Sequence, residues 1–204
     1  MAVAAVLVLA LAGWQFLRPT PVVNANPSGR NIIAFGDSLT AGGGAGRGED
    51  YVSQLSRMAG VPILNKGVSG DTSGQGLARL ERDVLAHDPR IVIVCLGGND
   101  ILQRIPSETT FANLEQIVTR IQAAGALVVL VGVDGGFLLG THGEDFRALA
   151  RRTGAVFVPS VLKGILDNPR LKADQIHPNG AGYTVMAERI HAKLKPYLEG
   201  GGAR

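Results

Sequence analysis

Hydrophobic residues along this chain form short continuous runs that alternate with segments of helical periodicity. The runs, rich in Val, Ile, Leu and Ala, cover residues 31–35, 61–64, 91–96, 126–131 and 155–158. The helical segments cover residues 51–59, 75–86, 109–124, 144–153 and about 181–198. Runs that are apolar on both faces predict strands covered by helices on both sides. Their alternation with helices predicts a parallel sheet with right-handed crossovers, and therefore one α/β domain built as a five-stranded three-layer α/β/α sandwich.

The first residues follow a different pattern. The stretch MAVAAVLVLALAGWQFL is apolar almost throughout, but it is shorter than the roughly 20 residues that span a bilayer. Residues 1–18 are therefore predicted to be a signal peptide or an N-terminal membrane anchor, although no Lys or Arg precedes the apolar run. A buried N-terminal helix is the alternative. The Pro/Asn-rich residues 19–30 predict a linker, residues 31–199 the domain and residues 200–204 a flexible tail. We expect export to the cell envelope, with a periplasmic domain that is either secreted or tethered to the inner membrane.

Composition narrows the classes of protein and of site. The chain of 204 residues is 46% hydrophobic and 18% charged, which is typical of a globular domain. Its net charge is +3, and the basic residues are scattered without aromatic interleaving, so no nucleic-acid-binding surface is predicted. Cys95 is the only cysteine, which excludes an intrachain disulfide and a thiolate metal cluster.

Small polar and glycine-rich segments follow the predicted strands. Ligands bind outside the carboxyl ends of the strands in open parallel sheets, so these segments are the place to look for chemistry. In chain order they read GDSLT (36–40), NKGVSGDTS (65–73), GGND (97–100), GVDGG (132–136) and DQIHPNG (174–180). Together they supply a hydroxyl, an imidazole, a carboxylate, an amide and backbone N–H donors, which are the groups that acyl transfer requires.

Each group has a predicted role. Ser38 is the candidate nucleophile and His177 the base that removes its proton. Asp174 lies three residues before His177 and reaches the ring if the segment makes one helical turn. The backbone N–H groups of Ser38 and Gly70 and the side-chain amide of Asn99 are candidate donors to an oxyanion. Glycine at position 70 allows a positive φ and a close approach of the backbone.

Neighbouring residues are predicted to support this site. Asp37 and Asp71 are expected to accept hydrogen bonds from loop backbone. Apolar residues near the strand ends are predicted either to join the core or to line an acyl groove. These substrate-binding candidates are Leu39, Leu102, Ile105 and Phe137.

In order along the chain, FGDSLTAG, GVSGDTS, GGND and DxxHP resemble the sequence blocks of the SGNH hydrolases, also called GDSL lipases/esterases. The similarity covers about residues 31–198, and it is strongest to the bacterial thioesterase I/lysophospholipase L1 and arylesterase group. The resemblance implies a flavodoxin-like sheet of order 2-1-3-4-5. It also implies Ser38, Asp174 and His177 as a catalytic triad, with Ser38, Gly70 and Asn99 as oxyanion donors.

The resemblance further implies a monomeric serine esterase that uses no metal or cofactor. Its expected substrates are small-molecule carboxylic esters or thioesters (lysophospholipids, acyl thioesters or aryl esters), hydrolysed through an acyl-serine intermediate. Two features depart from the family pattern: the glycine-rich loop after Ser38 and the loop GVDGGFLLGTHGED after the fourth strand. Both are expected to border the acyl pocket, so substrate preference stays open.

Other classes of protein are weighed against this one. A carbohydrate O-acetyl esterase and a non-catalytic envelope binding protein share the same fold. The stretch AGGGAGRG lacks both the G-x-G-x-x-G register and a Walker lysine, which argues against nucleotide binding. A two-metal hydrolase needs more ligands than Asp37, Asn99, Asp100 and His177 supply, and a chelator tests for it.

Overall fold

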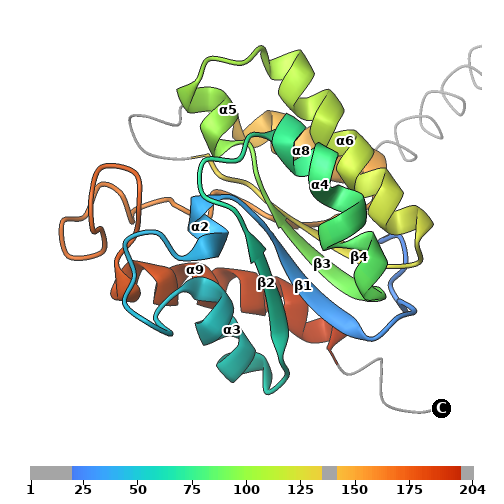
Figure 1. The fold of residues 1–204 in the computed structure, drawn as a ribbon, viewed down its shortest axis with the longest axis horizontal. Helices are drawn as coiled ribbons and strands as arrows, with labels where there is room; N and C mark the ends of the chain where they lie inside the picture. Colours follow the sequence, from blue (N-terminus) through green and yellow to red (C-terminus); the bar gives the residue numbers. More distant parts are fainter. Residues whose placement is uncertain (1–19, 135–141, 199–204) are drawn as a thin grey trace, which may run out of the picture.

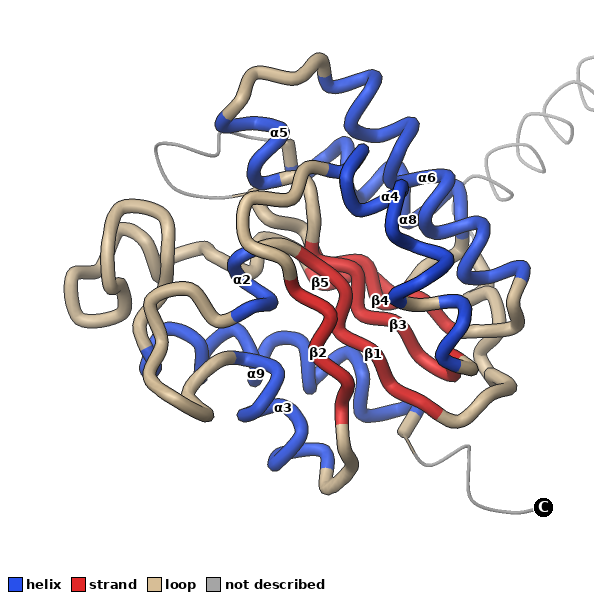
Figure 2. Tube along the Cα trace, viewed as in Figure 1, coloured by secondary structure: helices blue, strands red, loops and turns tan. Residues whose placement is uncertain are grey.

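The computed structural model describes residues 20–134 and 142–198 of the chain. Its strands form one five-stranded sheet in the order β2-β1-β3-β4-β5, in which Figure 1 labels β1 to β4 and Figure 2 also labels β5. All four pairings are parallel. In chain order the strands are β1 (Asn31–Gly36), β2 (Ile63–Gly67), β3 (Pro89–Cys95), β4 (Leu127–Val131) and β5 (Val156–Val158). The predicted order 2-1-3-4-5 is confirmed, and all loops after the strands therefore meet at one edge of the sheet.

Helices cover both faces of the sheet, which confirms the three-layer prediction (Figure 2). One layer consists of α3 (Tyr51–Ala59) and α9 (Gly180–Leu194), and the other of α4 (Ser73–Asp83), α6 (Ser107–Ala123) and α8 (Gly143–Thr153). Two short helices, α2 (Ser38–Ala41) and α5 (Gly98–Leu102), lie at the carboxyl edge of the strands, and 3-10 turns cover Leu85–His87 and Lys195–Tyr197. The side chains of the three central strands are almost all fully buried, as expected of a sheet covered on both faces.

Several element boundaries differ from the sequence prediction. Strand β2 begins at Ile63 and ends at Gly67, whereas the sequence predicts residues 61–64. Asn65 and Lys66 therefore belong to the strand. These polar residues are tolerated since β2 is an edge strand with one side open to water. Helix α4 starts earlier than predicted, because Thr72 and Gln75 form a capping box. Helix α9 ends at Leu194 and gives way to a 3-10 turn that contains Pro196.

The residues before β1 are hydrogen-bonded to the amino-terminal edge of the sheet. The N–H of Val23 donates to the carbonyl of Gly154 at 2.9 Å. The Asn24 amide donates to the carbonyls of Gln122 and Ala126, each at 2.9 Å. This part of the predicted linker therefore lies at the edge of the sheet opposite the loops that follow the strands. The predicted signal peptide or anchor (1–18) and tail (200–204) lie outside the described residues. Within residues 20–134 and 142–198, no helix combines the length and apolar character needed to cross a bilayer.

Candidate active site

Ser38 lies where β1 turns directly into α2. The preceding residue, Asp37, is the N-cap of α2, and its Oδ1 accepts the N–H of Leu39 at 3.0 Å. The N–H of Asp37 donates to the carbonyl of Cys95 at the end of β3, at 3.3 Å. The strand end, the cap and the neighbouring strand thus fix the backbone that carries the Ser38 hydroxyl.

Three side chains form a continuous hydrogen-bonded chain across this edge of the sheet. With the ring proton on Nδ1, the Ser38 hydroxyl donates to His177 Nε2 at 2.9 Å. His177 Nδ1 in turn donates to Asp174 Oδ2 at 2.8 Å. Ser38 and His177 are 139 residues apart in sequence, so the contact is produced by the fold alone. The structure brings together all three residues that the sequence predicted as a triad.

The segment that carries Asp174 and His177 is a bend, not the helical turn expected from sequence. His177 precedes Pro178, and a residue before proline is disfavoured in the helical region. Instead, Asp174 Oδ1 accepts the backbone N–H groups of Ile176 and His177, each at 2.8 Å. The carboxylate therefore holds both the loop and the imidazole.

The Asp174 carboxylate is adapted to stay ionised. Its partial desolvation acts to raise its pKa. Hydrogen bonds from the His177 ring and from the Ile176 and His177 backbone outweigh that effect, and they hold the pKa of Asp174 below its ordinary value. An ionised acceptor here favours the Nδ1–H tautomer of His177 and would stabilise an imidazolium.

The glycine-rich loop after α2 packs against the His177 ring. A Cβ atom at Gly43 would lie 2.9 Å from Cδ2 and 3.1 Å from Nε2 of that ring. The buried Tyr183 hydroxyl, on α9, donates to the carbonyl of Gly43 at 2.7 Å and holds the loop in place. Glycine at position 43 thus allows the backbone to approach the imidazole closely. Sequence reasoning missed Tyr183, since no pattern links it to the loop.

The predicted oxyanion donors lie in the loops after β1, β2 and β3. Among the described residues, the backbone N–H groups of Ser38 and Gly70 have no acceptor. The Asn99 amide donates to the carbonyl of Asp71 at 3.0 Å and lies 3.4 Å from Asp37 Oδ2. Gly70 has φ +85°, and a Cβ added there would meet no atom within 4 Å, so glycine is needed for its backbone conformation and not for a close approach.

The two aspartates beside the site behave differently from each other. Asp37 binds loop backbone as predicted. The expectation for Asp71 is wrong, because its carboxylate pairs with the buried Arg79 on α4. Burial raises the pKa of Asp37 from 3.8 to about 7, against the lowering effects of the Leu39 N–H and of His177. Asp37 is thus a buried acid that titrates near neutral pH.

Replacing Asp37 with asparagine is expected to change how stability depends on pH. In the wild type, the unfolded chain loses this proton near pH 3.8 and the folded chain only near 7. The folded state therefore loses stability as the pH rises between these values, by at most about 4 kcal/mol from this group. The Asp37→Asn variant lacks this loss, so its free energy of unfolding should rise relative to the wild type from pH 4 to pH 8.

Urea unfolding of both proteins at several pH values measures this difference. Asp167→Asn, at an exposed carboxylate in the segment after β5, is the control and should follow the wild-type curve. Parallel curves for Asp37→Asn and the wild type would show that Asp37 is not the titrating group.

The predicted substrate-binding residues have different environments. Leu39 is 5% exposed and belongs to the core, whereas Leu102 is 39% exposed. Phe137 lies outside the described residues. Ile105 lines a cavity of about 140 Å³ where α5, α6 and α8 meet at the carboxyl edge of the sheet. The complete lining is Gly97, Ile101, Arg104, Ile105, Ser107, Thr110, Phe111, His142 and Phe146.

Asp100, a candidate ligand of the metal alternative, faces the helix layer. Its Oδ2 accepts the N–H of Ser73 at 2.8 Å, and its Oδ1 accepts the Thr110 hydroxyl at 3.2 Å. In the two described ranges, no cluster of three or more His, Cys, Asp or Glu side chains is placed to hold a metal ion. Asp100 thus joins α4, α5 and α6 and does not face Ser38.

Comparison with known proteins agrees with this geometry. The GDSL-like Lipase/Acylhydrolase family model matches residues 34–185. The chain is 31% identical to the thioesterase 1/protease 1/lysophospholipase L1 of Escherichia coli K12, over 82% of this chain and 84% of that protein. It is 29% identical to esterase TesA of Pseudomonas aeruginosa, over 83% and 90%. An acetylxylan esterase of Geobacillus stearothermophilus is 24% identical, over 78% and 91%.

The fold agrees as well. A crystal structure of TesA superposes with a TM-score of 0.77 at 28% identity, covering 82% of this chain and 99% of that one. The chain therefore belongs to the GDSL-like lipase/acylhydrolase family, the SGNH hydrolases, and is a serine hydrolase that acts on esters.

Proposed function

We propose that this chain hydrolyses carboxylic esters or thioesters through an acyl intermediate on Ser38. The observation that carries the proposal is the chain of hydrogen bonds from Ser38 Oγ to His177 Nε2 at 2.9 Å and from His177 Nδ1 to Asp174 Oδ2 at 2.8 Å. A serine hydroxyl becomes a competent nucleophile when a base accepts its proton, and this imidazole is already in contact with it.

The reaction follows from these contacts. Ser38 Oγ attacks the substrate carbonyl while His177 Nε2 takes its proton, and Asp174 stabilises the imidazolium that forms. The ring then protonates the leaving alcohol or thiol, which departs and leaves an acyl-Ser38 ester. Water enters, gives its proton to His177 and attacks the acyl carbon, which releases the acid and restores the serine.

The negative oxygen of each tetrahedral intermediate needs donors at roughly 2.7–3.1 Å. The N–H groups of Ser38 and Gly70 have no acceptor among the described residues and supply two of them. The Asn99 amide supplies the third. One of its hydrogens is held by the Asp71 carbonyl, and the substrate oxyanion would replace the weak 3.4 Å contact of the amide nitrogen with Asp37.

Replacing Asn99 with alanine is expected to lower kcat for p-nitrophenyl butyrate by roughly 10²–10³-fold, the usual effect of losing one oxyanion donor. KM should change little, because the donor acts mainly on the transition state. Steady-state kinetics measures both constants. Asn113→Ala, at a partly buried amide on α6 that bonds to Ser73, is the control and should keep kcat within a few-fold. An unchanged kcat for Asn99→Ala would remove this residue from the oxyanion site.

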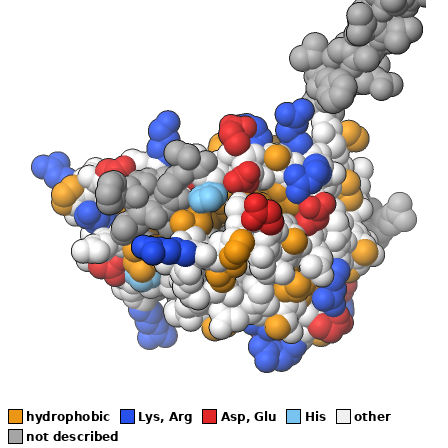
Figure 3. Space-filling model, turned by 90° about the horizontal axis from the view of Figure 1, so that it is seen from above, with side chains coloured by type: hydrophobic (Ala, Val, Ile, Leu, Met, Phe, Trp, Pro, Cys, Tyr) orange, Lys and Arg blue, Asp and Glu red, His pale blue; other side chains and the backbone are white. Residues whose placement is uncertain are grey.

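The substrate class we favour is a small ester with a short acyl chain or an aryl group. The cavity lined by Ile105 is also lined by Gly97, two residues before Asn99, and lies at the same edge of the sheet as Ser38. Its volume of about 140 Å³ is close to that of protein cavities that bind benzene. Seen from above, the hydrophobic side chains that the structure describes lie in small groups between charged and other side chains (Figure 3). The relative named acetylxylan esterase makes acetylated sugars the second candidate.

A series of p-nitrophenyl esters from acetate to palmitate, with the matching acyl-CoA thioesters and acetylated xylo-oligosaccharides, tests the substrate proposal. We expect kcat/KM to peak at a short acyl chain and to fall once the chain outgrows the cavity. Ile105→Trp, which fills the cavity, should shift the optimum to acetate, whereas Ile63→Trp on the edge strand β2 should leave it unchanged. A maximum at long acyl chains would contradict the proposal. The absence of turnover of any ester would favour the non-catalytic alternative.

We further propose that the protein acts as a monomer in the cell envelope, where residues 1–18 act as a signal peptide or membrane anchor. The apolar run in those residues supports this location. Cell fractionation, the mass of the mature protein and its size in solution test the proposal. A full-length protein in the cytoplasm would contradict it.

A further inference from the structure

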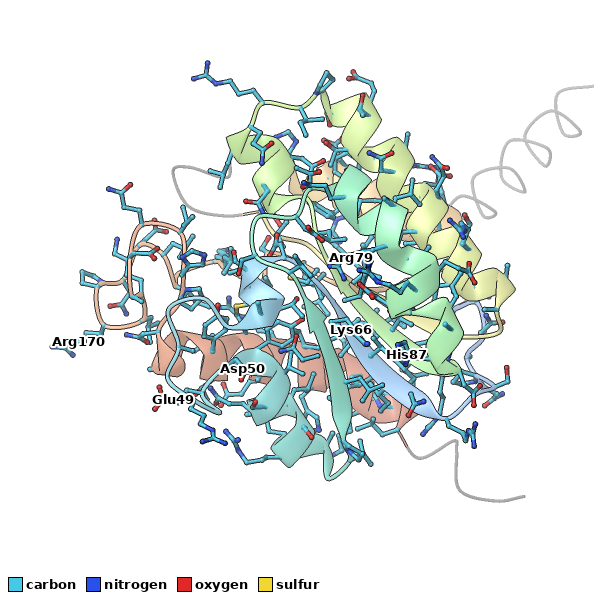
Figure 4. All side chains as sticks on the ribbon, viewed as in Figure 1. Glu49, Asp50, Lys66, Arg79, His87 and Arg170 are labelled. Carbon is cyan, nitrogen blue, oxygen red and sulfur yellow. The ribbon has the colours of Figure 1, made fainter. Side chains whose placement is uncertain are left out.

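The side chain of Arg79, on α4, is only 9% exposed and ties three separate segments together. Its Nε donates to Asp71 Oδ2 in the loop after β2. Its Nη2 donates to the carbonyl of Gly36 at the end of β1, at 2.8 Å, and its Nη1 donates to the carbonyl of Lys66 in β2, at 3.0 Å. In Figure 4 the labelled Arg79 lies between α4 and the sheet. One guanidinium thus joins the carboxyl ends of two neighbouring strands to the loop that follows one of them.

Two more contacts fix the guanidinium itself. It lies over the ring of Phe35, 4.3 Å from the centroid. Its Nη1 also donates to Asp83 Oδ2, one turn further along α4, at 3.1 Å. The planar group is therefore held on its face and on its edge, and Arg79 has little freedom to move.

These contacts lead to the proposed oxyanion donors. Asp71, which Arg79 holds by its carboxylate, directly follows Gly70, and its carbonyl accepts the Asn99 amide at 3.0 Å. The end of β1, which Arg79 holds by a carbonyl, leads two residues later into Ser38. Each of the three donors is therefore one or two residues, or one hydrogen bond, away from a group that Arg79 holds.

We propose that Arg79 is a positioning residue that sets the placement of the three oxyanion donors relative to one another; this rests on the proposed function. Gly70 has a positive φ and no side chain to anchor it. The carboxylate of the next residue therefore provides the loop with a strong attachment to the rest of the domain. Arg79 makes no hydrogen bond to Ser38, Asp174 or His177, so it acts through the segments that it holds.

Arginine suits this task and lysine does not. The guanidinium offers five N–H donors in a fixed plane, so it can bind acceptors on several segments at set angles. Lysine keeps the charge beside Asp71 and Asp83 but has a single donor atom on a flexible stem. Arg79→Lys therefore retains the charge but removes the hydrogen bonds by which one side chain joins the three segments.

The experiment compares wild type, Arg79→Lys, Asp71→Asn and Arg82→Lys. Arg82 is the matched control: it lies on the same helix, its side chain is 75% exposed, and it also pairs with Asp83. For each protein, kcat and KM for p-nitrophenyl butyrate are measured per active site titrated with a phosphonate. Inhibition by an aryl trifluoromethyl ketone is measured in parallel. In that inhibited complex Ser38 Oγ bonds to the ketone carbon, its proton moves to His177, and the former carbonyl oxygen becomes an oxyanion that the donors must bind.

For Arg79→Lys we expect a fall of about 100-fold in kcat, the size of effect that a misplacement near 1 Å can produce. KM should stay within a few-fold, ketone affinity should weaken by about as much as kcat/KM, and the pH dependence of kcat should keep its shape because the triad is intact. Asp71→Asn should weaken both turnover and ketone affinity in the same proportion, and by less. Arg82→Lys should match the wild type.

A merely structural role would reduce the number of titrated sites and leave kcat per site and ketone affinity unchanged, and that result would overturn the proposal. If Arg79→Lys yields no folded protein, Asp71→Asn carries the test with the same two measurements. The proposed function fails separately, when wild-type protein neither turns over an ester nor binds the ketone.

Discussion

Replacing Ser38 with alanine is expected to lower kcat for p-nitrophenyl butyrate by about 10⁵–10⁶-fold, as in other hydrolases that lose the nucleophile of such a triad. The variant has no oxygen within reach of the carbonyl that His177 could activate, so no acyl intermediate can form. What remains is the small acceleration that the oxyanion donors and substrate binding provide. Steady-state kinetics with the purified variant measures the loss.

The fold should survive this change. Ser38 contributes its hydroxyl to His177, whereas the turn around it depends on Asp37 and on backbone hydrogen bonds. Circular dichroism and the unfolding midpoint should therefore match the wild type. Ser28→Ala, at an exposed serine near the amino-terminal edge, should retain full activity. Ser38→Ala with wild-type turnover would end the assignment of the nucleophile.

Replacing His177 with alanine is expected to lower kcat by a comparable factor, about 10⁵–10⁶-fold, because nucleophile and base act as one unit. Without the imidazole, the Ser38 hydroxyl keeps its proton and the leaving group receives none. The Ser38→Ala, His177→Ala double variant should be no slower than either single variant, which is the signature of two groups that serve one step. Kinetics of all three variants tests this non-additivity.

His191→Ala, a substitution on α9 outside the site, is the control and should retain wild-type kcat. Losses that multiply in the double variant, or a single His177→Ala variant that stays within tenfold of the wild type, would mean that another base activates the serine.

Much of the architecture follows from the sequence, because the hydrophobic runs and periodic segments are long and clear. The central strands are nearly all apolar, and burial of both faces explains why they could be located. The ends of β2 could not be, since Asn65 and Lys66 resemble loop residues until the edge position of the strand is known. Helices α2 and α5, of four and five residues, are too short to show a period.

The active site likewise contains residues that could be predicted from the sequence and contacts that could not. Ser38, Asp174 and His177 could be found because their loops follow predicted elements at the carboxyl edge of one sheet, where topology brings them together. The partnership of Asp71 with Arg79 could not be found, because it depends on how α4 lies over the strand ends. The contact between Gly43 and the imidazole likewise depends on packing, although the glycine-rich loop marked the place.

Covalent labelling tests the central claim most directly. The wild-type protein is treated with one equivalent of diethyl p-nitrophenyl phosphate, residual esterase activity is measured, and the modified peptide is identified by mass spectrometry. The proposed mechanism predicts one diethylphosphoryl group per chain, on Ser38, with activity lost in proportion to the labelled fraction. Full turnover by protein labelled at Ser38, or inactivation through a label on a different residue, would contradict the acyl-serine mechanism.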